Sequence, residues 1–183
     1  MTEVDLSKFN NSWYKPARKI KIIVWYFVNI FIFKTMIPFP SSVKSIILRA
    51  FGAEVGSGVV IKPNVSIKYP WFLRIGDHCW IGEEVWIDNL AQVTIGNNVC
   101  LSQGAYLLTG SHDYKKEAFD LTLGKIVLES GVWIGAKATV CPSVICKSHS
   151  VLSAGSVATK DLEEFGVYQG NPAAWKRERK ISE

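Results

Sequence analysis

His112 is the strongest candidate for proton transfer in this chain of 183 residues. The unperturbed pKa of histidine, about 6.5, lets the side chain take up and return a proton near neutral pH. His112 stands at the root of a segment, 112–127, that interrupts an otherwise regular hydrophobic pattern, and insertions of this length favour a functional loop. We therefore predict that His112 is a general base, a role that contributes roughly 10²- to 10⁴-fold in rate.

Lys160 and Arg177 could bind the phosphates of an anionic ligand, because both cations form charge-assisted hydrogen bonds with phosphate oxygens. Arg177 belongs to the basic sequence WKRERK, so a solvated tail is an equal alternative. The net charge of +5 permits an anionic ligand or a membrane surface without requiring either. We expect no nucleic-acid partner.

A six-residue repeat must position these side chains. A period of six fits neither an amphipathic helix nor an alternating strand. It is typical of a hexapeptide β-helix, in which each hexad supplies one short strand and one turn, and the repeated side chain fills the interior. The repeated positions are Val55, Ile61, Ile67, Ile75, Ile81, Ile87, Ile95, Leu101, Leu107, Leu128, Ile134, Val140, Cys146 and Leu152.

Three hexads close one triangular coil. The phase of the repeat slips by two residues at Leu73 and again at Val93, each time after three hexads, so new coils begin near Ile75 and Ile95. The sequence thus predicts an all-β solenoid of parallel strands, with an N-terminal helical segment and a short C-terminal helix. We divide the chain into a helical cap at 1–51, a solenoid at 52–162 with its loop at 112–127, and a C-terminal extension at 163–183.

Residues next to the inward positions should point outward, because neighbours along a strand face opposite sides. Trp80 and Trp86 should therefore face outward, as should His112, one step beyond an inward Ser111. An outward tryptophan stripe favours a subunit interface over a sugar-binding platform, since copies of a flat face can bury its apolar area against one another.

The segment 17–39 combines the basic entry RKIK with twelve uncharged residues from Ile22 to Phe33. Twelve helical residues span about 18 Å, too short for a bilayer core of about 30 Å. The helix should cover the open end of the first coil, and contact of its cations with anionic lipid is a compatible second role. Ser41 or Ser42 should N-cap a second helix over 43–51.

The four cysteines form no CxxC pair and no metal-ligand spacing, and two of them, Cys79 and Cys146, fall in the inward phase. This usage favours a reduced, cytoplasmic setting, with peripheral association to the inner membrane face as an option.

Several motifs resemble those of the left-handed β-helix acetyltransferases, the family that includes galactoside and maltose acetyltransferases. They are the hexapeptide repeats, the histidine at the base of a loop, and the sequences VWIGAKATVCPSV, LSAGSVATKDL and YQGNPAA. The segments FGAEVGSGVVIKPNVSIKYPW, IGDHCWIGEEVWI and QGAYLLTGSHDY are closest to the colanic-acid-biosynthesis acetyltransferase branch. The resemblance covers nearly the whole chain. It implies a left-handed coil, a homotrimer, and acetyl-CoA as co-substrate in the cleft between neighbouring solenoids, with no metal.

The resemblance also implies roles for individual residues. His112 would take the proton of an acceptor hydroxyl as that oxygen attacks the thioester carbonyl directly. A thioester is already activated, and no nucleophile is paired with a base, so no covalent enzyme intermediate is expected. The implied acetyl-CoA contacts are Trp133 in the channel, the small residues Gly135, Ala136, Ser153 and Ala154 along the pantetheine arm, and Thr159, Lys160 and Arg177 near the adenosine and its phosphates.

The acceptor pocket departs from the sugar acetyltransferases, in which an asparagine on a preceding coil helps to hold the acceptor. Glu84 stands near that place here, so we assign Glu84, Asp88 and Asn89 to the acceptor site, where Asp88 or Glu84 could instead orient His112. The predicted function is O-acetylation of a carbohydrate, a surface or exopolysaccharide precursor. A nucleotide sugar or a small amine is the alternative acceptor.

Two other classes of protein compete with this interpretation. A metal-binding β-helix such as a γ-type carbonic anhydrase needs three histidines on one zinc. His78 and His149 fall in turns about three coils apart, roughly 14 Å at strand spacing, and cannot share a metal with His112. A non-catalytic trimer that binds sugar is the other alternative, and thiol release from acetyl-CoA separates it from an enzyme.

Overall fold

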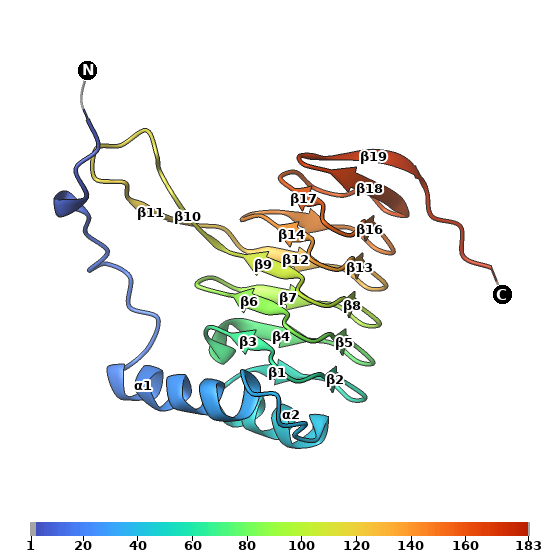
Figure 1. Cartoon of the computed structure of the whole chain (residues 1–183), viewed down its shortest axis with the longest axis horizontal. Coiled ribbons are helices and arrows are strands. Elements are labelled where there is room, and N and C mark those ends of the chain that lie inside the picture. The colour runs from blue at the N-terminus through green and yellow to red at the C-terminus, as the bar shows by residue number, and fades with distance from the viewer. Residues whose placement is uncertain (1–2, 183) are drawn as a thin grey trace.

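The computed structural model describes residues 3–182 as a solenoid of parallel β-strands. Two helices lie across its N-terminal end, a β-hairpin closes its C-terminal end, and a second hairpin projects from its side (Figure 1). The predicted all-β solenoid with N-terminal helices is therefore confirmed.

Three sheets form the walls of the solenoid, and each of its five coils adds one parallel strand to every wall; the hairpin β18–β19 then extends the second wall. The first wall consists of β1 (Glu54–Val55), β4 (Leu73–Ile75), β7 (Val93–Ile95), β12 (Ile126–Leu128) and β15 (Ile145–Cys146). The second wall consists of β2 (Val60–Ile61), β5 (Trp80–Ile81), β8 (Cys100–Leu101), β13 (Trp133–Ile134), β16 (Val151–Leu152), β18 (Gly166–Gly170) and β19 (Ala173–Glu178). The third wall consists of β3 (Ser66–Ile67), β6 (Trp86–Asp88), β9 (Tyr106–Leu108), β14 (Thr139–Val140) and β17 (Val157–Ala158).

The six-residue repeat specifies the core of the solenoid. All the predicted inward residues are at most 9% exposed, and Val55 pairs with Ile75 and Ile75 with Ile95, as the predicted coil starts require. Burying one such aliphatic side chain stabilises the fold by about 1.5–3 kcal/mol. Trp80 and Trp86 face outward as predicted, with 47% and 44% of their surface exposed.

Glycine follows the inward residue where successive coils stack closely. A Cβ on Gly135 would lie 2.5 Å from the amide nitrogen of Ala154, in the next coil. A Cβ on Gly76 would lie 2.8 Å from the carbonyl carbon of Gly96 in the same way. Side chains at these positions would force the coils apart, so the stacking of the chain on itself already requires these glycines.

An inserted corner links the first two coils and explains the predicted shift in phase. It contains the 3-10 helix η3 (Pro70–Phe72), and Asn89 from the next coil supports it. The side-chain carbonyl of Asn89 accepts from the amide of Tyr69 at 3.0 Å, and its amino group donates to the carbonyls of Tyr69 at 2.6 Å and Phe72 at 3.1 Å. Asn89 is fully buried, so its amide is committed to the fold and does not face an acceptor site.

The N-terminal helices cover the open edge of the first coil, as predicted. Helix α1 (Lys19–Val28) continues into the π-helical η2 (Asn29–Phe33), and α2 (Ser41–Ala50) follows. The indole of Trp25 donates to the carbonyl of Ile67 at 3.0 Å, and Arg49 Nε donates to the carbonyl of Val55 at 2.9 Å. These bonds satisfy backbone groups that an uncovered edge strand would expose. Within residues 3–182, no helix is both long and apolar enough to cross a bilayer.

Two predictions about helices were wrong: the N-cap of the second helix and the presence of a helix near the C-terminus. Helix α2 begins at Ser41, with Pro40 at the N-cap and no side-chain cap; the Ser41 hydroxyl accepts instead from the amide of Ile61 in the first coil, at 3.0 Å. The predicted C-terminal helix is absent from the described part of the chain. Strands β18 and β19 form an antiparallel hairpin there, because β18 extends the second wall by pairing with β16.

Lys44 is a buried cation at the junction of the helices and the first coil. Its ammonium group donates to the carbonyl oxygen of Lys62 at 2.8 Å and lies 5.9 Å from the centre of the Phe33 ring. Burial lowers the pKa of Lys44, because desolvation disfavours its charged form.

We expect Lys44 to make stability depend on pH. Its folded-state pKa lies below the unfolded value of 10.5, so between the two values the unfolded chain binds more protons and the free energy of unfolding rises with pH. In urea titrations, the free energy of unfolding of the wild type should therefore rise relative to that of Lys44→Met as the pH approaches 10.5. Lys19→Met, at an exposed position, is the control. If the difference in the free energy of unfolding between the wild type and Lys44→Met does not change with pH, this assignment is contradicted.

Candidate functional site

A groove of about 610 Å³ runs along the C-terminal half of the second wall. Its sides are turns from three successive coils, which stack through backbone hydrogen bonds such as Ser102 N to Ile134 O at 2.9 Å and Gly135 N to Leu152 O at 2.8 Å. Six of the eight residues assigned to acetyl-CoA line this groove, namely Trp133, Gly135, Ala136, Ser153, Ala154 and Arg177. The structure therefore brings most of the predicted set together in one site.

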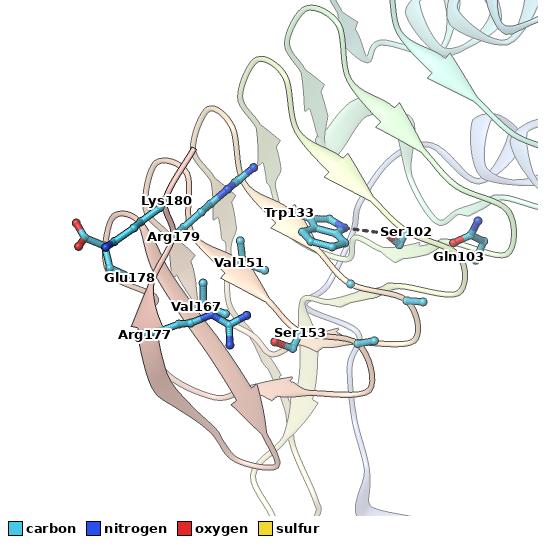
Figure 2. A pocket seen from close by; sticks show the side chains of 13 residues that line it. Ser102, Gln103, Trp133, Val151, Ser153, Val167, Arg177, Glu178, Arg179 and Lys180 are labelled. Atoms are coloured by element: carbon cyan, nitrogen blue, oxygen red, sulfur yellow. Dashed lines mark hydrogen bonds between the residues drawn. The ribbon is translucent and has the colours of Figure 1, made fainter. Parts of the chain in front are cut away.

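The floor of the groove follows a single register line across the second wall. Trp133 pairs with Val151, Val151 with Val167, and Val167 with Arg177. Figure 2 shows Trp133 and Arg177 on either side of the two valines. The groove thus has an aromatic end, an apolar middle and a basic end, a lining that suits a ligand with an apolar arm and anionic groups.

Hydrogen bonds fix both ends of the groove. The indole Nε1 of Trp133 donates to Ser102 Oγ at 2.9 Å, which holds the ring against the preceding coil (Figure 2). At the basic end, the Arg179 guanidinium donates to the carbonyls of Gly131 at 2.8 Å and His149 at 3.1 Å. Arg179 therefore anchors the C-terminal strand, while the exposed Arg177 and Lys180 leave positive charge at the mouth of the groove.

Thr159 and Lys160 do not line the groove. Both follow β17, a strand of the third wall, and both are exposed. Several residues that do line it were not predicted: Ser102, Gln103, Val151, Val167, Glu178, Arg179 and Lys180. Ser102 and Gln103 could have been found by projecting the turn at Gly135 back by one coil.

The positions of Arg177 and Lys160 predict different effects on cofactor binding. Arg177→Ala should raise the KM for acetyl-CoA about tenfold, because it would remove the charge-assisted contact that Arg177 is predicted to make with a phosphate at the mouth of the groove. Lys160→Ala is the matched control, and it should leave this KM unchanged. Steady-state kinetics with varied acetyl-CoA measure both values. Equal effects of the two substitutions would show that the groove does not hold the phosphates.

His112 lies on the hairpin that projects from the solenoid. Strands β10 (Gly110–His112) and β11 (Leu121–Leu123) pair antiparallel and leave the third wall directly after β9. His112 is exposed, as predicted. Ser111 is also exposed and not inward, because the chain has already left the coil at that residue. The N-terminal segment packs on the same hairpin, where Asp5 N donates to Glu117 O at 3.0 Å.

The hairpin itself orients the imidazole of His112. The ring stacks on Phe119, with centroids 4.5 Å apart, and the Phe9 ring lies tilted to it with a centroid distance of 5.7 Å. His112 Nδ1 lies 2.8 Å from the carbonyl oxygen of Phe119. A carbonyl can only accept, so in the neutral ring Nδ1 carries the hydrogen and Nε2 is left with a free lone pair for a proton. The Asp113 carboxylate accepts instead from Lys115 N, at 3.1 Å.

His112 and the groove lie apart within one chain. The hollow beside His112, of about 270 Å³, is lined by Leu6, Phe9, His112 and Phe119, and it shares no residue with the groove. The hairpin extends away from the side where β13 and β16 stand (Figure 1). One chain therefore presents the predicted base and the predicted cofactor groove on different faces.

The predicted acceptor residues lie near an aromatic pair on the third wall. Trp86 stacks on Tyr106 with centroids 4.7 Å apart, and Tyr106 donates to Asp88 Oδ2 at 3.4 Å. Burial and then the charge of Asp88 raise the pKa of Tyr106 to about 12, so its hydroxyl stays protonated. Glu84 and Trp86 share a hollow of about 330 Å³. Of the three predicted residues, Glu84 is exposed and lines this hollow, Asp88 is half-buried outside it, and the fully buried Asn89 cannot contact a ligand.

The chain matches known proteins over almost its full length. Residues 73–109 match the family described as the hexapeptide repeat of succinyl-transferase. Over 176 residues the chain is 36% identical to the Escherichia coli K12 protein named "Putative colanic acid biosynthesis acetyltransferase WcaF", which covers 96% of this chain and 97% of that protein. Galactoside O-acetyltransferase of the same organism is 30% identical over 140 residues, or 72% of this chain and 66% of that protein.

A solved structure shares the fold. A hexapeptide-repeat acetyltransferase from Vibrio cholerae, crystallised with acetyl-CoA, superposes with a TM-score of 0.72 at 27% identity, over 80% of this chain and 81% of that one. The solenoid and its groove define a hexapeptide-repeat protein. With these relatives, the chain belongs to the hexapeptide-repeat acetyltransferase family, which confirms the resemblance of the motifs.

Within residues 3–182, no group of three His, Cys, Asp or Glu side chains is arranged to hold a metal.

Proposed function

We propose that the protein transfers the acetyl group of acetyl-CoA to a hydroxyl group of a carbohydrate, a precursor of a surface polysaccharide. The observation that carries this proposal is the groove between Trp133 and Arg177, with its apolar middle and basic end. The Vibrio relative was crystallised with acetyl-CoA, and the two Escherichia coli relatives are named for colanic acid biosynthesis and for a galactoside. The four free thiols suit the cytoplasm.

The separation of His112 from the groove supports assembly into a ring of three copies. In a closed ring, a head-to-tail interface joins the third-wall side of one chain to the second-wall side of the next. Such an interface would bring the hairpin of one copy to the groove of its neighbour, and it would cover the exposed Trp80 and Trp86. In the predicted homotrimer, His112 of one chain and the groove of the next chain thus form one complete site.

In this site His112 acts as the general base. Its Nε2 takes the proton of the acceptor hydroxyl while that oxygen attacks the acetyl carbonyl carbon, the carbon–sulfur bond breaks, and the coenzyme A thiolate leaves. The Phe119 carbonyl holds Nδ1–H, which stabilises the imidazolium as it forms. Because the thioester needs no further activation, positioning and proton transfer are sufficient.

Release of the coenzyme A thiol tests the proposal. Purified protein is incubated with acetyl-CoA and a panel of free sugars, nucleotide sugars, amino sugars and lipid-linked oligosaccharides, and thiol release is followed together with the mass of the acceptor. A carbohydrate that gains one acetyl group on oxygen supports the proposal. Acetylation of an amine alone would correct the acceptor class, and binding of sugars without thiol release would indicate a non-catalytic protein.

A further inference from the structure

Helix α1 and its continuation η2 have two apolar faces. The inner face, with Trp25 and Phe33 fully buried, packs on the first coil. The outer face carries a second stripe at helical spacing, and its side chains are 45% to 67% exposed. This apolar stripe consists of Ile20, Ile23, Val24, Phe27 and Phe31. A cap that only shielded the solenoid would need the inner face alone.

The exposed apolar surface continues beyond the stripe. Met36 and Ile37, in the link between the helices, are 72% and 58% exposed, and Ile46 on α2 is 62% exposed. Figure 1 shows α1 and α2 side by side across the N-terminal end of the solenoid. The exposed apolar residues therefore gather at one end of the molecule, and such a concentration of apolar side chains is typical of an interaction surface.

The same end is strongly cationic. Residues 15–53 contain seven Lys and Arg and no Asp or Glu, whereas residues 54–183 contain thirteen Lys and Arg against fourteen Asp and Glu. Lys15, Arg18, Lys19 and Lys34 are exposed around the helices. The partner of this surface should accordingly be both apolar and anionic.

These properties discriminate between two occupants. A second copy of the same end would place one cationic surface against another, and this repulsion opposes pairing. An anionic lipid surface accepts the aromatic and aliphatic side chains at the boundary of its acyl chains and the cations among its headgroups. We propose that the N-terminal helical end docks on an anionic membrane surface, with the apolar stripe inserted and Arg18 and Lys19 among the lipid headgroups.

This docking fixes the direction of the solenoid. Helices α1 and α2 lie across its end, so the membrane would face that end, and the groove near the C-terminal coils would stay in water (Figure 1). A soluble cofactor could then reach the groove while the protein rests on lipid. The inference does not depend on the proposed acetyl transfer, since it uses residues outside the groove and outside the hairpin.

Flotation with vesicles tests the docking. Wild-type protein is mixed with vesicles of phosphatidylcholine containing about one third phosphatidylglycerol, or of phosphatidylcholine alone, at low and high salt. We expect the protein to float with the anionic vesicles and to be released by salt. Phe27→Ser/Phe31→Ser should weaken this binding at least about tenfold, and Arg18→Gln/Lys19→Gln about tenfold with a smaller salt effect.

Matched measurements separate docking from misfolding and from subunit assembly. Ile181→Ser removes an exposed aliphatic side chain in the segment after β19, which lies away from the N-terminal helices (Figure 1), and it should float like the wild type. The thermal midpoint and the oligomeric mass of both double variants should equal those of the wild type. The proposal is overturned if the wild type stays with the soluble fraction, or if Phe27→Ser/Phe31→Ser floats unchanged. A change in oligomeric mass in that variant, without vesicle binding by the wild type, would reassign the stripe to a subunit interface.

Discussion

His112→Ala should lower kcat at least about a hundredfold, because in the proposed mechanism the acceptor hydroxyl then has no base to take its proton. The KM for acetyl-CoA should change little, since His112 shares no contact with the groove of its own chain and acts only on the acceptor oxygen. Its side chain is exposed, so the fold and the thermal midpoint should be preserved. Turnover in the thiol-release assay gives the result.

Two further substitutions show whether the loss reflects proton transfer. His112→Gln retains an amide that can donate to the Phe119 carbonyl but cannot take a proton at neutral pH. It should be as slow as His112→Ala if the ring is the base, and it should recover activity if the ring only shapes the hairpin. His78→Asn is the matched control, because His78 is exposed in a turn with φ +55°, a conformation that asparagine tolerates. Wild-type turnover in His112→Ala would remove this residue from the mechanism.

The walls of the solenoid could be predicted because the repeat constrains every residue in them. Once Ile75 points inward, the period of six places Ile81 and Ile87 inward as well, and the pleat then turns Trp80 and Trp86 outward. An error of one residue would bury polar side chains throughout the coil. The repeat therefore allows only one assignment of inward and outward residues wherever it continues without interruption.

The contacts that hold the corners and the structure of the chain ends could not be predicted, because they depend on partners far away in sequence. Asn89 is a polar residue that could equally have faced a ligand, and only the corner at Pro70–Phe72 commits its amide to the backbone. The C-terminal residues become strands because β16 offers them an open edge. Arg179 is held at the groove by hydrogen bonds to the carbonyls of Gly131 and His149. No pattern in the sequence around Arg179 predicts these bonds.

The hairpin shows the same limit within the candidate site. The break in the repeat located His112, and the type of residue predicted its chemistry. From the sequence, a carboxylate, that of Asp88 or Glu84, could orient the ring. The structure uses the carbonyl of Phe119, a residue with φ +52°, which follows from the path of the hairpin and not from any side chain.

Two variants that are inactive alone should restore activity when they assemble together. In the proposed ring, each site takes His112 from one chain and the groove from the next, so it needs one intact face from each neighbour. His112→Ala removes the base, and Ala154→Trp fills the groove at an exposed position without disturbing the core. Trimers assembled at random from equal amounts of the two would contain both intact faces at about a quarter of their sites.

Co-expression of the two variants with different tags, and purification through both tags, isolates the mixed assemblies. Their turnover should be about a third of the wild-type value, because double-tag purification removes the pure trimers and every mixed trimer has one intact site in three; each parent alone should be at least about a hundredfold slower than wild type. A site contained within one chain gives the opposite result, because every chain in the mixture then carries one defect and no site is intact. Turnover at the level of the parents, in assemblies shown to contain both chains, would therefore reject the shared site even if His112 is the base.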